Sequence, residues 1–523
     1  MGTEPGSAAA RAGASGKYVP DPRRWKALTV CLIVGFMALL DVSIVNVALP
    51  AIEKGLGASE SALSWVVSGY ALTFGLVLVP SGRLGDALGR RTAFFAGLVL
   101  FTVASVVCGL AQDPSWLVIA RLVQGIGGGL LMPQISGMIQ QLFRGAERGK
   151  AFGLLGSTIG ISTAVGPLLG GLLIQAFGAA EGWRWVFFVN LPIGVLAFCL
   201  GLRLVPAACA ERDSSRRESF DPFGVLLLGA GVIAIMLPLV EERQWQGPGK
   251  WLLEPVGVLL IFAFLRWERS YLRAGREPLV DLRLFADRSY SLGALLGLLY
   301  FAGFTTIFFV FTLFLQNGMR YSALQAGLSL TPFAVGSAVS AAVGGRFVIR
   351  VGRPLIAAGL VLVAIGLGGA GLAVHEVQNH SVGWAMAPPM LVAGLGSGLV
   401  ISPNQTLALQ SVPIAQGGAA GGVLQTGQRI GSAAGVAAVG AVFFAWLASS
   451  HDWATALDYG LLAALCFVVA ALVVALFDVM YGRREARREG QERGEGARGA
   501  ETRPEGQEQG KGADGASAAG PAG

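Results

Sequence analysis

The sequence predicts an all-α integral membrane protein with fourteen membrane-spanning helices. Three observations support this fold class. Of the 523 residues, 54% are hydrophobic and only 14% are charged, whereas soluble domains carry about a quarter of charged residues. Fourteen apolar stretches between Lys26 and Met480 are long enough to cross a bilayer, which takes about 20 residues of helix. Basic residues gather in alternate connections between these stretches, as the positive-inside rule describes.

The composition excludes several other classes of protein. The net charge is +7, but the basic residues lie in short clusters between apolar stretches and form no single solvated face for nucleic acid. The 5 cysteines include no C-x-x-C pair, and the 3 histidines have no ligand-spaced partner, so we expect no disulfide framework and no metal site. No G-x-S-x-G or H-E-x-x-H motif occurs, so we predict neither an enzyme nor a cofactor. We also expect no obligate protein partner.

The basic connections set the predicted orientation. Connections on one side carry Arg83, Arg90, Arg91, Arg144, Arg148, Lys150, Arg212, Arg216, Arg217, Arg269, Arg273, Arg276, Arg283, Arg288, Arg346, Arg350 and Arg353. The opposite connections are nearly bare, with Lys54, Arg243, Lys250 and Arg320 as the main exceptions. The rule therefore places both termini in the cytoplasm and the 375–382 connection outside. Arginine far outnumbers lysine, which hints at a GC-rich genome, and we expect a multi-pass protein of a bacterial cytoplasmic membrane.

The two ends of the chain differ from the rest. Residues 1–24 and 481–523 are polar, rich in Gly, Ala, Arg and Glu, and show no periodicity. We predict that both are disordered cytoplasmic segments. The first apolar stretch follows a polar leader and no small-residue cleavage site comes after it, so we expect it to stay as a membrane anchor.

An internal repeat predicts two halves. A Gly at position 82 is followed seven residues later by Gly89-Arg90, and Gly345 is followed at the same distance by Gly352-Arg353. Alternating glycines from Gly125 and from Gly394 repeat in the same order. Transporters built from two repeats carry the substrate path between the halves. We therefore predict six-helix halves at 25–204 and 289–480, with two inserted helices and their flanking loops at 205–288.

Four motifs carry a more specific resemblance. They are Leu40 to Pro50 in the first stretch, Gly82 to Arg91 after the second, Arg121 to Gly125 in the fourth, and Gly166 to Gly171 in the fifth. A further segment, Trp183 to Gly194, follows them. Together and in this order they resemble the major facilitator superfamily, and within it the fourteen-span drug:proton antiporter family. The resemblance covers about residues 25–480 and implies the major facilitator fold.

We expect five residues to serve proton coupling and substrate binding. They are Asp41, Asn46, Arg121, Gln124 and Arg429. Asp41 lies about 22 Å along its helix, and a lone carboxylate in a low-dielectric medium takes up a proton readily. Arg121 cannot lose its proton, so it would favour the ionised form of a nearby carboxylate. The alternatives are a polar packing contact for Asp41 and a structural hydrogen bond for Arg121. Arg429 would contact substrate, balance Asp41 or make a structural bond.

Two further groups of residues are expected to control the conformation. The loop motif Gly82, Asp86, Gly89, Arg90 and Arg91 would form a gate. By resemblance, Asp86 would face the positive N-terminus of the thirteenth helix near Gly418 in an outward-open state; the alternative is simple solvation.

We expect the fifth helix to carry one face of small residues along which the two halves pack closely, forming a seam. This face consists of the antiporter motif Gly166, Pro167, Gly170 and Gly171, together with Gly156 and Gly160. Small residues let helices approach closely, although ordinary membrane packing also uses them. In the ninth stretch, Phe301, Phe304, Phe308 and Phe311 share a helical face, which would wall a cavity or pack in the core.

These features predict a proton-coupled antiporter that exports small amphiphilic compounds, with protons, lipid and a small lipophilic substrate as its only partners. The alternatives are a proton-coupled importer of a small solute, and a membrane sensor or enzyme. The path carries few fixed charges, which fits a neutral or monocationic substrate such as an antibiotic or a dye. The stretches 289–315 and 323–345 contain no acidic residue, which argues against a preference for dications.

Overall fold

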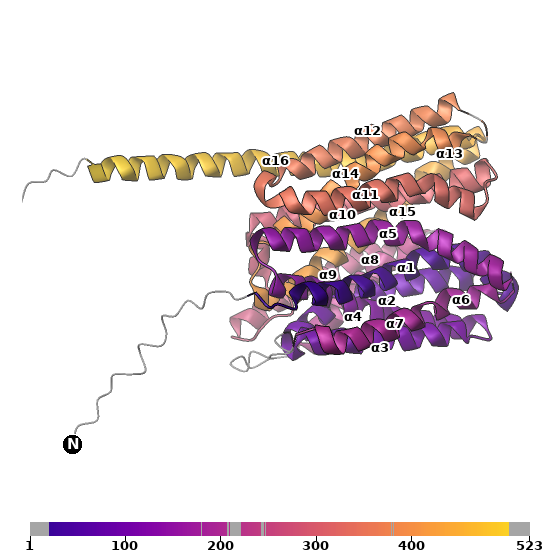
Figure 1. The fold of residues 1–523 in the computed structure, drawn as a ribbon, viewed down its shortest axis with the longest axis horizontal. Helices are drawn as coiled ribbons and strands as arrows, with labels where there is room; N and C mark the ends of the chain where they lie inside the picture. Colours follow the sequence, from indigo (N-terminus) through magenta and orange to yellow (C-terminus); the bar gives the residue numbers. More distant parts are fainter. Residues whose placement is uncertain are drawn as a thin grey trace, which may run out of the picture. The chain divides into compact units, whose positions relative to one another are not determined.

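The computed structural model describes residues 20–178, 180–206, 209, 221–241, 245, 247–377, 379 and 381–501. The leader 1–19, residues 210–220 and the end of the tail at 502–523 lie outside the described residues. The described part is almost entirely helical (Figure 1). Its elements are α1 (Arg24–Leu56), α2 (Glu60–Leu88), α3 (Arg90–Gly109), α4 (Pro114–Leu142), α5 (Gly145–Phe177), α6 (Gly182–Phe188), α7 (Asn190–Leu204), α8 (Pro222–Val240), η3 (Pro248–Leu252), α9 (Leu253–Arg273), η4 (Leu282–Ala286), α10 (Arg288–Leu313), η5 (Phe314–Gly318), α11 (Ala323–Val351), α12 (Pro354–Glu376), α13 (Val382–Ala385), α14 (Ala387–Ala408), η6 (Ile414–Gln416), α15 (Gly417–Ser450) and α16 (Trp453–Glu501).

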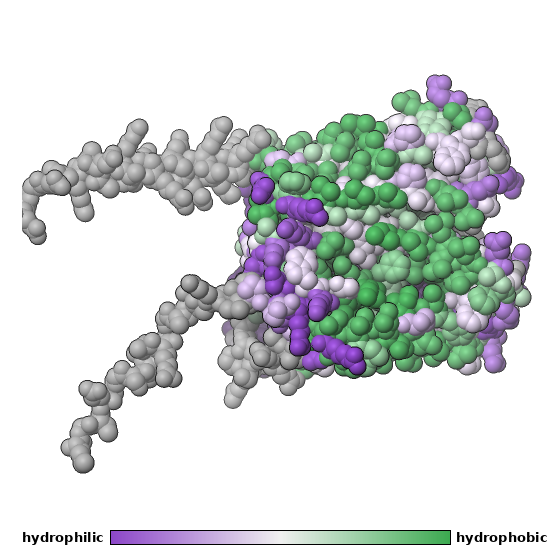
Figure 2. Space-filling view, in the orientation of Figure 1, coloured by the Kyte–Doolittle hydropathy of each residue, from purple (hydrophilic) through white to green (hydrophobic). Residues whose placement is uncertain are grey.

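Thirteen helices of the described chain are long and apolar enough to cross a membrane. The remaining predicted stretch, 383–410, forms α13 and α14. Its Ser, Pro, Asn and Gln residues near Pro403 lower its hydropathy, and it packs between α11 and α12. The chain is a multi-pass membrane protein whose large apolar side chains are widely exposed, and in Figure 2 they cover the middle of the visible face.

Local sequence signals determine where the helices begin. Asp113 caps α4 by accepting a hydrogen bond from the Trp116 amide at 2.9 Å, and Pro114 occupies the first turn, where a missing N–H costs nothing. Ser322 and Gln325 form a capping box at the start of α11. The helix ends are therefore encoded by short polar motifs between the apolar stretches.

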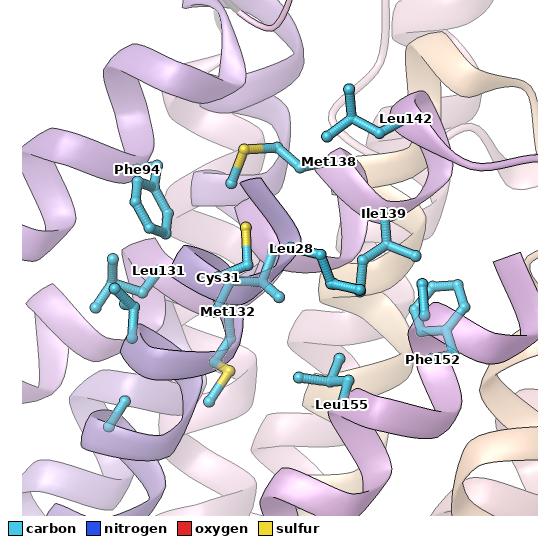
Figure 3. Close-up of a cluster of buried hydrophobic side chains, with 14 of the residues drawn as sticks. Leu28, Cys31, Phe94, Leu131, Met132, Met138, Ile139, Leu142, Phe152 and Leu155 are labelled. Atoms are coloured by element: carbon cyan, nitrogen blue, oxygen red, sulfur yellow. The ribbon is translucent and has the colours of Figure 1, made fainter. Parts of the chain in front are cut away.

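We call α1–α7 the first set of helices and α10–α16 the second, and two of the apolar cores lie mainly within one set each. The first includes side chains of α1, α3, α4 and α5, such as Cys31, Phe94, Met132 and Leu155 (Figure 3). The second gathers side chains of α10 to α16. Between the two sets, α5 packs against α11 and α2 packs against α15, while α8 and α9 pair and α8 contacts both α2 and α15. Figure 1 shows α5 beside both α1 and α11.

The arginine-rich connections meet at one end of the helical bundle, which we call the gate end. Arg24 pairs with Glu147 at 3.0 Å, Arg83 pairs with Glu277, and Gln416 donates to Asp281 at 3.2 Å. These contacts join the connections that the sequence predicts on one side. The residues of the 210–220 connection lie outside the described part of the chain.

The chain divides into two units, Met1–Leu476 and Phe477–Gly523. Within the second unit, α16 continues as helix to Glu501. The prediction of a disordered tail from residue 481 is therefore wrong for residues 481–501. The reason is compositional, because Arg, Glu and Ala make up 14 of these 21 residues and are strong helix formers.

Candidate functional site

The predicted coupling residues separate into two groups. Asp41, Arg121 and Gln124 form one buried cluster within the first set of helices, with exposures of 0%, 1% and 0%. Asn46 and Arg429 instead line a cavity between the two sets. The structure therefore brings three of the five predicted residues together and places the other two on a different surface.

The buried cluster is centred on the carboxylate of Asp41. Arg121 Nη1 lies 2.6 Å from Oδ2. The other oxygen, Oδ1, accepts hydrogen bonds from Gln124 Nε2 at 2.8 Å and from Asn190 Nδ2 at 3.0 Å. The premise of a lone carboxylate is therefore wrong, because an arginine and two carboxamides from α4 and α7 surround it.

The guanidinium of Arg121 is held on several sides. Its Nε donates to the Val66 carbonyl at 3.0 Å, and Nη1 also donates to Gln124 Oε1 at 2.8 Å. Its Cζ atom lies 4.1 Å from the centre of the Tyr70 ring, a cation–π contact. The ion pair thus links α1, α2 and α4. Breaking a pair buried to this degree by removing one partner destabilises a protein by about 3–5 kcal/mol.

Two members of this cluster were not predicted. Asn190 Nδ2 bridges Asp41 and Ser105 Oγ, at 3.0 Å in each case. Ser105 in turn donates to the Phe187 carbonyl at 2.9 Å. Asn190 lies in the 183–194 segment that carries the resemblance, and a carboxamide in an otherwise apolar stretch was the available signal.

Asp86 closes the gate end by capping a helix of the other set. Its Oδ1 accepts a hydrogen bond from the Gly418 amide at 3.1 Å, and its Oδ2 accepts one from the Ala419 amide at 2.9 Å. These amides belong to the first turn of α15, where unpaired N–H groups and the helix dipole attract an anion. The contact with the thirteenth membrane helix that the resemblance implied is present.

The two arginines of the loop motif behave differently. Arg90 pairs with Asp86 at 2.8 Å and also donates to the carbonyls of Gly137 and Ile414, so it joins α3, α4 and the chain before α15. Arg91 donates to the Leu202 carbonyl at 3.0 Å and takes no part in this contact. Gly89 has a φ of 95° at the turn between α2 and α3, a conformation that favours glycine.

Glycines let the two sets of helices touch through their backbones at the gate end. A Cβ on Gly82 would overlap the carbonyl of Gly418, and a Cβ on Gly345 would overlap the carbonyl of Gly149. Gly82 and Gly345 are the positions matched by the internal repeat. The α2–α15 and α5–α11 contacts are therefore two versions of one arrangement.

We expect Gly82→Ala to reduce transport at least tenfold at equal membrane abundance. The new methyl group and the Gly418 carbonyl cannot occupy the same space, so the closed gate end would be lost. Substrate efflux from intact cells is the measurement. Gly368→Ala is the matched control, because a Cβ there meets no atom within 4 Å. Wild-type efflux by the Gly82 variant would show that this backbone contact is dispensable.

The small residues of α5 form two seams. Gly156 and Gly160 face Ala341 and Ala338 of α11, so they pack between the two sets of helices. Gly166 and Gly170 face Ser43 and Ile44 of α1, within the first set, and a Cβ on Gly171 would meet no atom within 4 Å. The prediction of one seam is therefore wrong, because a helical rotation of 100° per residue turns the two glycine pairs to different neighbours.

A cavity of about 410 Å³ lies between the two sets of helices. Its size is within the range of small-molecule sites. The lining includes Leu39, Val42, Ser43, Asn46, Val47, Pro50, Met132, Ser136, Leu155, Ile159, Thr163, Ala164, Pro167, Phe301, Phe304, Thr305, Phe308, Thr312, Gln316, Ala326, Gly327, Leu330, Ala334, Gln405, Gln425, Gln428, Arg429 and Ser432. Three of the four aligned phenylalanines thus wall the cavity, while Phe311 is buried in the second core.

Helix α1 connects the cavity to the buried cluster. Asp41 is fully buried against α4 and α7, whereas Val42, Ser43 and Asn46 line the cavity. On α2, Tyr70 contacts Arg121, and its ring lies 5.8 Å from that of Phe74. Phe74 in turn lies 4.5 Å from the Arg429 guanidinium. Two rings therefore separate the buried ion pair from the cavity arginine.

This architecture is that of a two-part membrane transporter, and comparison with known proteins gives its family. The model of the Major Facilitator Superfamily matches residues 31–436. The chain belongs to this superfamily.

Curated relatives cover most of the chain. One is a probable actinorhodin transporter of Streptomyces coelicolor, 37% identical over 82% of this chain and 74% of the relative. Another is the puromycin resistance protein pur8 of Streptomyces alboniger, 36% identical over 81% and 82% of the two chains. A third is the tetracenomycin C resistance and export protein of Streptomyces glaucescens, 32% identical over 80% and 76%.

Solved structures share the fold. The proton:xylose symporter XylE superposes with a TM-score of 0.61 at 17% identity, covering 86% of this chain and 94% of XylE. The human organic anion transporter MFSD10 gives 0.61 at 16% identity, over 87% and 100%.

Proposed function

We propose that this chain is a proton-coupled antiporter that exports small amphiphilic compounds, including antibiotics, across a bacterial cytoplasmic membrane. The observation that carries the proposal is the position of Asp41. It is the carboxylate of a fully buried ion pair, on a helix whose next residue lines the cavity between the two sets of helices. Relatives named as antibiotic transporters and resistance proteins support the class of substrate.

The contacts at the gate end suggest how the cavity opens to one side of the membrane and then to the other. Asp86 holds the N-terminus of α15, and glycine backbones touch across the α2–α15 and α5–α11 contacts. With the gate end on the cytoplasmic side, the structure is a state closed to the cytoplasm. Releasing Asp86 from Gly418 and Ala419 would let the sets rock apart there, which is the alternating access of two-repeat transporters.

Protonation of Asp41 would drive that exchange. In the structure the carboxylate pairs with Arg121, so a proton reaches it only when this pair opens. The neutral carboxyl no longer attracts the guanidinium, and α1 and α4 become free to shift relative to each other. Each proton that enters against one exported molecule supplies about 2.3 kcal/mol per 100 mV.

Everted membrane vesicles test the proposal. A growth-inhibition panel comparing cells with and without the protein first identifies an exported antibiotic or dye. Vesicles with an acidic interior should then accumulate that compound, and dissipating the gradient with an ionophore should stop accumulation. Uptake into right-side-out vesicles driven by external acid would instead identify an importer.

The proposed orientation gives a separate prediction. In a chain whose native cysteines are replaced, a membrane-impermeant maleimide added to intact cells should label Ser381→Cys and leave Arg350→Cys unlabelled. Both positions are exposed, and they lie at opposite ends of α12. Labelling after permeabilisation is the control for reactivity. The reverse pattern would invert the topology.

A further inference from the structure

An arginine, Arg429, lines the cavity. Among the described residues that line it, Arg429 is the one ionisable group, and the rest are apolar, hydroxyl or carboxamide side chains. Arginine stays protonated at any physiological pH. The cavity therefore carries a fixed positive charge that no lining carboxylate offsets.

The surroundings of Arg429 leave this charge available. Its guanidinium lies over the Phe74 ring at 4.5 Å, and in the described part of the chain no hydrogen bond or acidic partner accompanies that contact. The nearby carboxylate of Asp41 is already paired with Arg121 at 2.6 Å. In this structure Arg121, and not Arg429, forms the ion pair with Asp41.

Other lining groups suit a flat, electron-rich molecule. The carboxamides of Gln316, Gln405, Gln425 and Gln428 supply hydrogen-bond donors. Gln405 and Gln425 also donate to Ser136 Oγ at 3.3 and 3.2 Å, which fixes their orientation. On α10, the rings of the lining residues Phe304 and Phe308 lie 5.4 Å apart in an edge arrangement and offer an aromatic surface.

We propose that the cavity selects aromatic organic anions, such as carboxylates and phenolates, over organic cations. The inference rests on the proposed export function and replaces the expectation of a neutral or monocationic substrate. An anion placed against Arg429 gains a charge-assisted hydrogen bond, while a cation of equal size is repelled. At a separation of about 6 Å and an effective dielectric constant of about 20, the attraction alone is worth about a hundredfold in affinity for the anion, and the repulsion of the cation widens the difference further.

Two dyes of one ring system provide the test. Fluorescein is an anion at pH 8, and rhodamine 123 is a cation with the same xanthene framework. Binding to the purified protein in phosphatidylcholine nanodiscs is measured by fluorescence anisotropy, with empty nanodiscs as the blank. We expect fluorescein to bind at least tenfold more tightly than rhodamine 123.

Variants then assign the preference to one residue. Arg429→Gln should weaken fluorescein binding at least tenfold and remove the preference, whereas Arg429→Lys should retain most of it. Arg350→Gln, an exposed arginine at the end of α11, is the matched control. Equal or tighter binding of rhodamine 123, a preference that survives in Arg429→Gln, or no binding of either dye would overturn the inference.

This assay uses no proton gradient, so it separates the two proposals. Gradient-driven export by a protein without an anion preference would overturn the substrate class and leave the export function standing. An anion preference in a protein that fails the vesicle test would remove the export function.

Discussion

Replacing Asp41 by asparagine should abolish proton-coupled accumulation. The carboxamide keeps the shape of the side chain but cannot titrate, so substrate-induced proton movement in vesicles should fall to the level of empty membranes. Accumulation against a gradient should fall at least tenfold. Asp41→Glu keeps a carboxyl group and should retain partial activity with a changed pH profile.

The ion pair adds an expected effect on stability. Asp41→Asn leaves Arg121 buried without its anion, which destabilises a protein by about 3–5 kcal/mol. The double variant Asp41→Asn/Arg121→Gln removes both charges and should recover much of this loss. If the double variant is stable and inactive, the lost transport reflects coupling and not misfolding. Asp41→Asn that moves protons as well as the wild type would make Asp41 structural, with Asp86 the next candidate.

Arg121→Ala should reduce coupled export by a similar amount, because Arg121 is the other partner of the ion pair. The carboxylate of Asp41 would keep Gln124 and Asn190 as donors but lose its cation. A proton would then neutralise it whether the cavity is open to the cytoplasm or to the outside. Coupled export should be lost while the protein still reaches the membrane. Arg121→Lys keeps the charge but loses the planar fork that contacts Asp41, Gln124 and Val66 at once. It should therefore retain at most a fraction of wild-type coupled export.

The dependence of efflux on the proton gradient distinguishes the Arg121→Ala variant from the wild type. Wild-type export should rise with the proton gradient, whereas export by Arg121→Ala should be independent of it. Both measurements need equal membrane abundance, checked by immunoblotting. Coupled transport by the alanine variant at the wild-type rate would reduce Arg121 to a packing residue.

The fold was largely predictable because its signals are local. A run of apolar residues forms a helix regardless of its neighbours, and the arginines at 83, 144 and 346 label one end of the bundle. The gate was also accessible, because Asp86 belongs to a loop motif of fixed spacing and the resemblance implies its partner, the N-terminus of the thirteenth helix near Gly418. The helical tail at 481–501 was missed because low hydropathy was taken for disorder.

The buried cluster was only partly predictable because it joins distant positions. Asp41 meets Arg121 across 80 residues and Asn190 across 149 residues, and no local pattern encodes that meeting. The sequence also did not show whether a residue of a given helix lies toward the bundle interior or toward the cavity. Asp41 and Asn46 share one motif, yet one lies in the bundle interior and the other in the cavity.

The polar character of α14 has a consequence for how the chain enters the membrane. A helix with Ser402, Pro403, Asn404 and Gln405 near its end gains little from leaving the translocon for lipid on its own. Its polar groups are instead satisfied by protein, as Asn404 donates to the Gly293 carbonyl of α10 at 2.9 Å and Gln405 reaches Ser136 of α4. We therefore expect biogenesis to keep α14 close to helices made earlier, so that its insertion is a step of tertiary assembly that follows the insertion of α4, α10 and α11.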